Sequence, residues 1–319
     1  MKIFIAGATG AIGKRLVPLL ISEGHRVTGS TRTEGKFDAI RALGAEAVVL
    51  DGLDQPAINA AIASFRPDVV VHQMTSLSSL KSLKHFDEDF EQTNRLRTLG
   101  TEYLLAAARS VGAKKFIAQS YAGWPNNRTG PRVQTEDAPY ETNPPESMRK
   151  SLQAIVTLES FVRNASGITA IALRYGSFYG PGTSLGADGD VTNMVRHRKF
   201  PVVGTGAGVW SFLHVEDAAQ ATKLAIDRAP AGIYNIVDDE PAEASQWLPY
   251  LADCLDAKPP RHIPVWLAKF AIGEAGVLFM TEMRGASNAK AKREFNWQPA
   301  FASWREGFRR GLADPVRPA

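Results

Sequence analysis

The sequence of 319 residues contains only one cysteine, Cys254, so it cannot form an intramolecular disulfide. This scarcity fits a reducing compartment, and we expect a cytoplasmic protein in which Cys254 is a buried filler rather than a nucleophile. Charge of one sign is not in excess either, with 37 Lys and Arg against 33 Asp and Glu, and no basic run is interleaved with aromatic residues. We therefore expect no nucleic-acid partner.

Long uninterrupted hydrophobic runs are also absent. The most apolar window, residues 263–280, contains two charges and three helix-weakening residues, which makes it a poor membrane span. A core or interface helix, continuous or broken, is the better interpretation, and we expect no membrane partner. No spaced set of His, Asp and Glu residues accompanies His72, so we also expect no bound metal.

The sequence does contain a regular alternation of short β-prone runs and helical periodicities through its first half. The predicted strands and helices cover residues 2–6, 11–23, 26–31, 37–43, 47–50, 56–65, 68–72, 89–110, 115–120, 148–164 and 168–175. The same signals resume at residues 218–228 and 233–237. Such alternation predicts an α/β fold with a doubly wound parallel sheet.

A glycine-rich segment, residues 7–13, lies between the first predicted strand and the first predicted helix. Glycines in such a turn let the backbone approach a pyrophosphate, whose charge is attracted to the helix N-terminus. A purely structural tight turn is the alternative, but the strand–turn–helix context favours a dinucleotide. The predicted cofactor-binding residues here are Gly7, Thr9, Gly10, Ala11, Ile12 and Gly13.

The spacing Gly-x-x-Gly-x-x-Gly resembles that of the extended short-chain dehydrogenase/reductases, the NAD-dependent epimerase/dehydratase family. Three later segments carry the same resemblance: Val48-Val49-Leu50-Asp51-Gly52-Leu53-Asp54, Leu173-Arg174-Tyr175-Gly176-Ser177-Phe178-Tyr179-Gly180-Pro181-Gly182, and Phe212-Leu213-His214-Val215-Glu216-Asp217-Ala218-Ala219. The resemblance covers most of the chain. It implies a Rossmann-type dinucleotide-binding domain. The strand–helix alternation loosens from about residue 176, where Gly and Pro become frequent, so we expect this domain over residues 1–175 and a smaller substrate-binding region over residues 176–319, with residues 218–237 returning to the first domain.

The resemblance also implies further cofactor contacts. Asp51 is expected to hold the adenine amino group beside Gly52, although a strand-end turn residue is the alternative. Gln73 is expected near the cofactor ribose. Contacts are also expected from Tyr175, Ser177 and Phe178.

Helix caps account for three other polar residues. Asp54 is expected to cap the helix that begins at Pro56, and His214 and Asp217 are expected to anchor the helix that begins near Glu216.

The end of the second predicted strand bears on which cofactor binds. A free ribose 2′-hydroxyl usually meets an acid there, whereas a 2′-phosphate needs a cation. Residues 27–31 contain no acid, Arg32 follows them, and Lys36 is near. We therefore predict NADP as the cofactor, with NAD as the alternative if Arg32 is merely exposed.

The pair of residues with which this family transfers protons is missing. Family members use a Tyr and a Lys four residues later, on the helix after the fifth strand. None of the seven tyrosines, at positions 103, 121, 140, 175, 179, 234 and 250, has Lys at that spacing. If Glu159 matches the family's Glu on this helix, Ser151 and Ile155 occupy the two positions. We therefore expect an atypical member.

Two residues at the end of the fifth strand are the candidates for catalysis. Ser120 fits the first of the two hydroxyl residues that end this strand in the family, and Tyr121 brings a phenol to the second position. Tyr121 either donates the proton or anchors the substrate, or it simply packs beside the nicotinamide. Ser120 is a candidate hydrogen-bond donor to substrate or cofactor.

Two tryptophans suggest the kind of substrate. Trp210 lies about where sugar-nucleotide enzymes of this family carry an Arg for the diphosphate, and with Trp124 it favours an apolar or aromatic molecule. The alternative is that Trp210 belongs to the core.

We therefore predict an NADP-dependent oxidoreductase acting on a small, apolar or aromatic carbonyl or alcohol, with a homodimer as one possible assembly. The alternatives are a non-catalytic NAD(P)-binding sensor or interaction protein, and a sugar-nucleotide epimerase or dehydratase.

Overall fold

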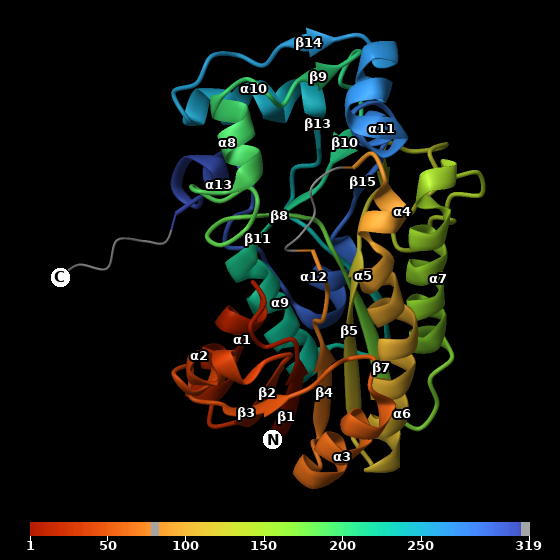
Figure 1. The fold of residues 1–319 in the computed structure, drawn as a ribbon, viewed down its shortest axis with the longest axis vertical. Coiled ribbons are helices and arrows are strands. Elements are labelled where there is room, and N and C mark those ends of the chain that lie inside the picture. Colours follow the sequence, from red (N-terminus) through yellow and green to blue (C-terminus); the bar gives the residue numbers. More distant parts are fainter. Residues whose placement is uncertain (78–82, 314–319) are drawn as a thin grey trace, which may run out of the picture.

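A seven-stranded sheet forms the centre of the computed structural model, which describes residues 1–77 and 83–313 (Figure 1). Its strand order is β12-β7-β5-β4-β1-β2-β3, and all neighbouring strands are parallel. The strands are β1 (Lys2–Ala6), β2 (Arg26–Thr31), β3 (Glu46–Val49), β4 (Val69–His72), β5 (Lys115–Tyr121), β7 (Thr169–Tyr175) and β12 (Gly232–Ile236). The predicted doubly wound parallel sheet is confirmed.

Helices cover both faces of this sheet because its strands are apolar on both sides. In β1, Ile3 and Ile5 face one hydrophobic core while Phe4 and Ala6 face the other. The first core lies under α1 (Gly13–Ser22), α9 (Val215–Arg228) and α12 (Ala289–Phe295). The second lies under α3 (Gln55–Phe65), α6 (Thr101–Ser110) and α7 (Arg149–Arg163), and the short η1 (Glu34–Lys36) and α2 (Phe37–Arg41) follow β2.

The helix predicted over residues 89–110 is not continuous. It consists of α4 (Phe86–Asp89), α5 (Glu91–Arg95), the π-helical turn η2 (Leu96–Gly100) and α6. At the end of the π turn the Thr101 amide bonds the Leu96 carbonyl, five residues back. The same carbonyl lies 3.1 Å from Nε2 of the buried His72. This second hydrogen bond at Leu96 accompanies the irregular turn.

A smaller lobe lies beyond the carboxyl ends of the strands (Figure 1). Its core contains Trp247, Trp304, Phe212 and Phe308. The elements are η3 (Glu146–Met148), α8 (Asp190–Arg196), α10 (Ala244–Cys254), α11 (Val265–Thr281) and α13 (Trp304–Arg310), with the strand pairs β8 (Ser177–Tyr179) and β11 (Phe212–His214), β9 (Val202–Val203) and β14 (His262–Ile263), β10 (Val209–Trp210) and β13 (Ala242–Glu243), and β6 (Val133–Gln134) and β15 (Gly285–Ala286).

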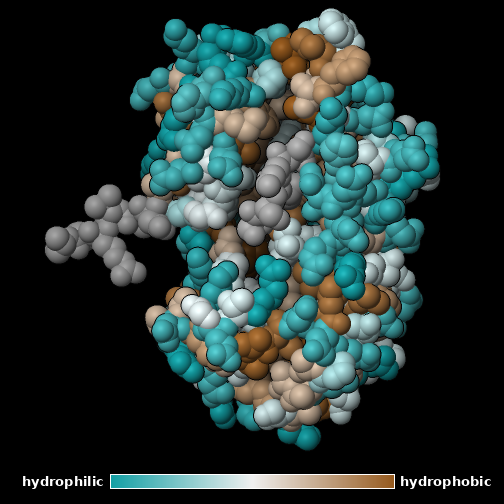
Figure 2. All heavy atoms as spheres, viewed as in Figure 1, coloured by the Kyte–Doolittle hydropathy of each residue, from teal (hydrophilic) through white to brown (hydrophobic). Residues whose placement is uncertain are grey.

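Helix α11 corresponds to the most apolar window of the sequence, and it is broken. Gly273 has a φ of 73°, and a Cβ there would lie 2.6 Å from the Cα of Lys84, so glycine is required. Its first half exposes Trp266 and Phe270, and apolar spheres lie near the top of Figure 2, where Figure 1 places α11. Within residues 1–77 and 83–313, no helix has the length and apolar character needed to cross a membrane.

The expected caps at Asp54 and His214 are confirmed, whereas the Asp217 carboxylate does not cap α9 and instead holds a segment distant in sequence. Asp54 accepts a hydrogen bond from the Ala57 amide at the start of α3. His214 accepts one from the Glu216 amide at the start of α9. The Asp217 carboxylate binds the Ala300 and Phe301 amides. Cys254, at the end of α10, is half-buried rather than buried.

Candidate functional site

The turn between β1 and α1 requires glycine at two of its positions. Gly7 has a φ of 93°, and a Cβ there would lie 2.9 Å from the Gln73 carbonyl oxygen. A Cβ at Gly13 would lie 2.4 Å from the Ala8 carbonyl oxygen. Gly10, by contrast, is exposed, and a Cβ would approach only the Gly7 oxygen, at 3.4 Å. The space above Gly10 therefore remains open to a ligand.

The N-terminus of α1 leaves backbone donors available. No side chain caps this helix. The amides of Ala11, Ile12 and Gly13 form no hydrogen bond with any residue that the structure describes. Unpaired amides at a helix N-terminus carry partial positive charge and bind phosphate groups. Together with the open space above Gly10 and the nearby Thr9, they fit the pyrophosphate of a dinucleotide.

The end of β2 presents unpaired basic side chains. Arg32 and Lys36 are both exposed, and neither forms a hydrogen bond or ion pair with a described residue. Asp51, at the end of β3, is exposed as well. One of its carboxylate oxygens accepts a hydrogen bond from the Leu53 amide at 3.0 Å, so it forms a turn while leaving its other oxygen available. Gly52 is buried under Met74 and Leu96.

Four of the predicted cofactor residues lie just after β4, at the end of β7 and in β8. The Gln73 amide donates to the Tyr175 hydroxyl at 3.0 Å, while its own oxygen has no partner among the described residues. Tyr175 also bonds Thr222 at 2.6 Å, and burial raises the pKa of Tyr175 to about 12. The Phe178 ring lies 5.5 Å from that of Tyr175, and Ser177 lies beside them.

Ser120 belongs to a buried charged network. Its hydroxyl donates to Glu159 at 2.7 Å, and Glu159 also pairs with Arg174 at 2.6 Å and accepts from the Tyr140 hydroxyl at 2.5 Å. Burial alone would raise the pKa of Glu159, but the hydrogen bond and charge of Arg174 overcome that effect and lower it. The Ser120 hydroxyl is thus engaged inside the protein. Sequence reasoning missed this network, because nothing along the chain links positions 120, 140, 159 and 174.

Tyr121 points to the opposite side of the sheet from Ser120, because β5 continues through both residues. The Tyr121 hydroxyl lies 3.1 Å from the Ser177 hydroxyl. Burial raises the pKa of Tyr121, and the hydrogen bond with Ser177 and the charge of Arg97 oppose that rise. The phenol is therefore protonated at neutral pH.

Helix α7 offers no substitute for the missing proton donor. The Ser151 hydroxyl donates to Asp87 at 2.6 Å and accepts from Asn94 at 2.9 Å. Ile155 is buried in an apolar cluster, and Lys150 is exposed. In the part of the chain that the structure describes, no lysine ammonium acts on the Tyr121 phenol.

An aromatic cluster lies beside Tyr121. The Trp124 ring lies 5.4 Å from that of Phe86 and 6.4 Å from that of Phe279, and Tyr121 packs against the same group. Trp210 lies 6.2 Å from Phe279, and its indole N–H donates to the Phe279 carbonyl at 2.9 Å. The structure thus brings Tyr121, Trp124 and Trp210 together, although Trp210 also belongs to the core of the smaller lobe.

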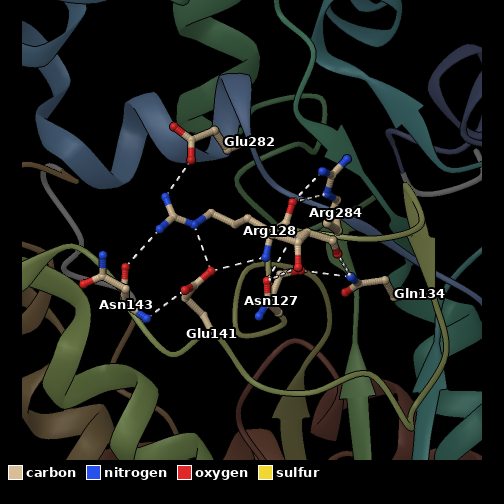
Figure 3. Close-up of polar contacts among 8 residues, drawn as sticks. Asn127, Arg128, Gln134, Glu141, Asn143, Glu282 and Arg284 are labelled. Atoms are coloured by element: carbon tan, nitrogen blue, oxygen red, sulfur yellow. Dashed lines mark hydrogen bonds and ion pairs between the residues drawn. The ribbon is translucent and has the colours of Figure 1, made fainter.

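The loop that carries Trp124 is fastened by Arg128 (Figure 3). Its guanidinium bonds Glu141 at 2.9 Å, Glu282 at 2.6 Å and the Asn143 carbonyl at 2.9 Å. The Arg128 carbonyl in turn accepts from Arg284 at 2.8 Å. These contacts tie the loop between β5 and α7 to the end of α11, so they fix the wall of the aromatic cluster.

Arg97 is a site residue that sequence reasoning missed. It lies in the π turn and is 6% exposed, and its Nη1 atom has no hydrogen-bond partner among the described residues. Burial lowers its pKa to about 10, and the Tyr121 phenol opposes this. The chain position of Arg97, inside an apparently regular helix, gave no signal of its burial.

Comparisons with known proteins agree with this architecture. The model of the NAD dependent epimerase/dehydratase family matches residues 3–237. A Streptomyces protein named 3-diazoavenalumate denitrifying reductase is 42% identical over 314 residues, which cover 97% of this chain and 100% of that protein. A Stigmatella aurantiaca ketoreductase acting on a farnesylated dihydroquinoline oxide is 25% identical over 79% of this chain and 73% of its own.

Solved structures share the fold. UDP-glucose 4-epimerase from Thermotoga maritima, with UDP-glucose, has a TM-score of 0.76 at 22% identity and covers 98% of this chain and 97% of its own. A human epimerase family protein with NADPH has a TM-score of 0.76 at 18% identity, covering 98% and 99%. The chain is therefore an NAD(P)-dependent oxidoreductase or epimerase that belongs to the NAD dependent epimerase/dehydratase family.

Proposed function

We propose that this enzyme is an NADPH-dependent reductase that removes the diazo group from a small aromatic diazonium substrate. The observation that carries the proposal is the buried Tyr121 phenol, whose pKa is raised and which has no lysine ammonium beside it among the residues that the structure describes. A reaction that needs a hydride but no proton suits such a site. The 42% identity with a diazo reductase over the whole chain supports the same reaction class.

The chemistry balances without a proton donor. When bound, NADPH supplies a hydride that forms a carbon–hydrogen bond at the ring carbon, while the carbon–nitrogen bond breaks and N₂ leaves with the bonding electron pair. Ser120 and Ser151 need not take part, since their hydroxyls are held by Glu159 and Asp87. The protein's contribution is then to orient the ring and exclude competing water.

The aromatic cluster supports a flat apolar substrate. Trp124, Phe86 and Phe279 pack against one another beside Tyr121, so a substrate ring next to Tyr121 would adjoin an aromatic cluster. Such surfaces bind another aromatic ring through offset or edge contacts. The Trp210 indole already donates to a carbonyl, so it offers apolar surface rather than a free donor.

The choice of NADPH rests on Arg32 and Lys36, which are exposed after β2 and form no hydrogen bond or ion pair with a described residue. The planar guanidinium of Arg32 would pair with a ribose 2′-phosphate there. A homodimer stays a prediction, which sedimentation velocity would test.

The test is a turnover assay. Purified protein with NADPH is expected to convert diazotised 3-aminobenzoate to benzoate, and NADPH deuterated at its transferable position is expected to place deuterium on the ring. UDP-glucose, the matched control, should cause no cofactor oxidation. Product without deuterium, or no product with cofactor bound, would contradict the proposed reaction.

Carbonyl reduction is the second candidate, because the Tyr121 hydroxyl is hydrogen-bonded with Ser177 and can still give up a proton. The two reactions respond differently to Tyr121→Phe. If Tyr121 is the acid in carbonyl reduction, the variant loses about 10²-fold in turnover. Diazo reduction should change by less than about threefold, because no proton is transferred. Steady-state kinetics with an aromatic ketone and the diazonium probe would separate them, with NADPH affinity as the control.

A further inference from the structure

Arg97 is a buried cation that has no acidic partner among the described residues. It projects from the π turn Leu96–Gly100, is 6% exposed, and leaves Nη1 without a hydrogen bond to any described residue. No ion pair involves Arg97 within residues 1–77 and 83–313. Residues 78–82 lie outside the described residues, and their sequence, Ser-Ser-Leu-Lys-Ser, contains no carboxylate.

An unpaired buried charge is costly, so buried arginines are normally matched by an anion. Arg97 keeps its charge at neutral pH, since its lowered pKa is still about 10. The protein thus holds a desolvated guanidinium that would gain more from an incoming anion than an exposed arginine would.

The position of Arg97 is defined by its neighbours. Its guanidinium lies 5.9 Å from the centre of the Phe90 ring, and its charge acts on the Tyr121 phenol. Tyr121 in turn packs against the aromatic cluster with Trp124. His72 fixes the turn itself through the Leu96 carbonyl. The cation therefore lies next to the cluster that we assign to the substrate ring.

We propose that Arg97 binds a carboxylate of the substrate, so that the enzyme acts on aromatic acids. This inference rests on the proposed function, because it names the substrate class for the same site. A planar guanidinium pairs with a planar carboxylate through two parallel hydrogen bonds, which fixes the orientation of the attached ring. Arg97 thereby selects the substrate without taking part in bond making or breaking.

A matched pair of substrates tests this role in turnover. The probes are diazotised 3-aminobenzoate and its methyl ester. Arg97→Gln is expected to raise KM for the acid by about 10-fold or more, and to change KM for the ester by less than about twofold. Arg95→Gln, at an exposed position of α5, is the control and should affect neither probe. Equal losses for acid and ester in Arg97→Gln would overturn the proposal.

Equilibrium binding tests the same role without turnover. Cinnamate and methyl cinnamate are titrated into the NADP⁺-loaded full chain by calorimetry. Cinnamate should bind the wild type at least about 10-fold more tightly than Arg97→Gln, whereas the ester should not distinguish them. If cinnamate binds in this way but the diazonium probe is not turned over, the proposed reaction is wrong and the carboxylate site is still supported. Equal affinity of the wild type for acid and ester would refute the site.

Two further readouts keep the test decisive. If Arg97→Gln does not fold, Arg97→Lys replaces it, because this variant keeps the charge but loses the planar guanidinium that makes two parallel hydrogen bonds. Arg97→Lys should still lose several-fold more affinity for cinnamate than for methyl cinnamate. If Arg97 instead served to tune Tyr121, its loss would shift the pH at which the Tyr121 phenol ionises, which an ultraviolet titration measures as the difference from the same titration of Tyr121→Phe. We expect at most a small shift, and a large one would overturn the assignment.

Discussion

Arg32 is a single side chain that bears on cofactor choice. Because Arg32 is exposed and pairs with none of the described residues, its truncation should not disturb the fold. We expect Arg32→Ala to weaken NADPH binding by about 1.5–3 kcal/mol, roughly 10- to 100-fold, and to leave NADH binding nearly unchanged. Calorimetric titration measures both. Arg41→Ala, at an exposed position paired with Asp38, is the control. Equal loss for both cofactors would show that Arg32 does not contact the 2′-phosphate.

Substitutions at Gly10 and Gly13, in the same loop, should affect different properties: the first dinucleotide binding and the second stability. A side chain at Gly10 meets only the Gly7 oxygen at 3.4 Å, so Gly10→Val should fold yet lose dinucleotide binding, because its methyl groups would occupy the pyrophosphate's path. Gly13→Ala should instead destabilise the protein, since its Cβ would collide with Ala8 at 2.4 Å. Thermal melts and NADPH titrations check both. Normal NADPH affinity in a folded Gly10→Val protein would place the cofactor elsewhere.

Residue-level chemistry was predictable where the contact is local in sequence. Asp54 and His214 cap helices that begin within two residues of them, so spacing alone identified them. Ser120 was not open to such reasoning, because its partner Glu159 lies 39 residues away. The hydrogen bond between Ser120 and Glu159 depends on how α7 packs on β5, and no local sequence pattern predicts that packing.

At the level of an element, His72 connects the end of β4 to the π turn. Nε2 contacts the Leu96 carbonyl and Nδ1 accepts from the Met74 amide, a pattern that needs the neutral ring. Burial lowers the pKa of His72 from 6.5 to about 4. The unfolded chain therefore binds more protons than the folded chain between these pH values, and stability falls as the pH drops through them.

We accordingly expect the free energy of unfolding to decrease by about 2 kcal/mol between pH 7 and pH 5 because of His72. His72→Gln should remove that part of the pH dependence, whatever its effect on stability at pH 7. Urea unfolding at the two pH values measures it. His197→Gln, at an exposed position, serves as the control. An unchanged pH slope in His72→Gln would contradict the assignment.

The same element shows where prediction from sequence failed. Residues 89–110 have the composition of one long helix, yet the chain breaks into α5, a π turn and α6. The break coincides with a hydrogen bond from His72, which is distant in sequence. Strands and most helices were predicted within a few residues because their apolar period is local. Arg97 escaped notice because its burial depends on that tertiary contact.

For the molecule as a whole, Arg128 joins the loop after β5 to α11 (Figure 3). Arg128→Ala would leave the buried Glu141 carboxylate without its cation. We expect a loss of about 2 kcal/mol in stability and a raised KM for aromatic substrates, with NADPH affinity unchanged. Arg132→Ala, which removes a more exposed pair with Glu243, should cost at most about 1 kcal/mol. Similar melting temperatures and KM values for the two variants would contradict this role.

The pairing of β6 with β15 determines the order in which parts of the fold can form during synthesis. The Gly285 amide bonds the Arg132 carbonyl and the Ser287 amide bonds the Gln134 carbonyl, so the loop after β5 is completed by residues about 150 positions later. Six of the seven sheet strands, by contrast, lie within the first 175 residues. During synthesis the nascent chain can form the glycine turn and most of its sheet early, but Trp124 must wait for Phe279. A ribosome-bound chain should thus form its glycine turn well before its aromatic cluster.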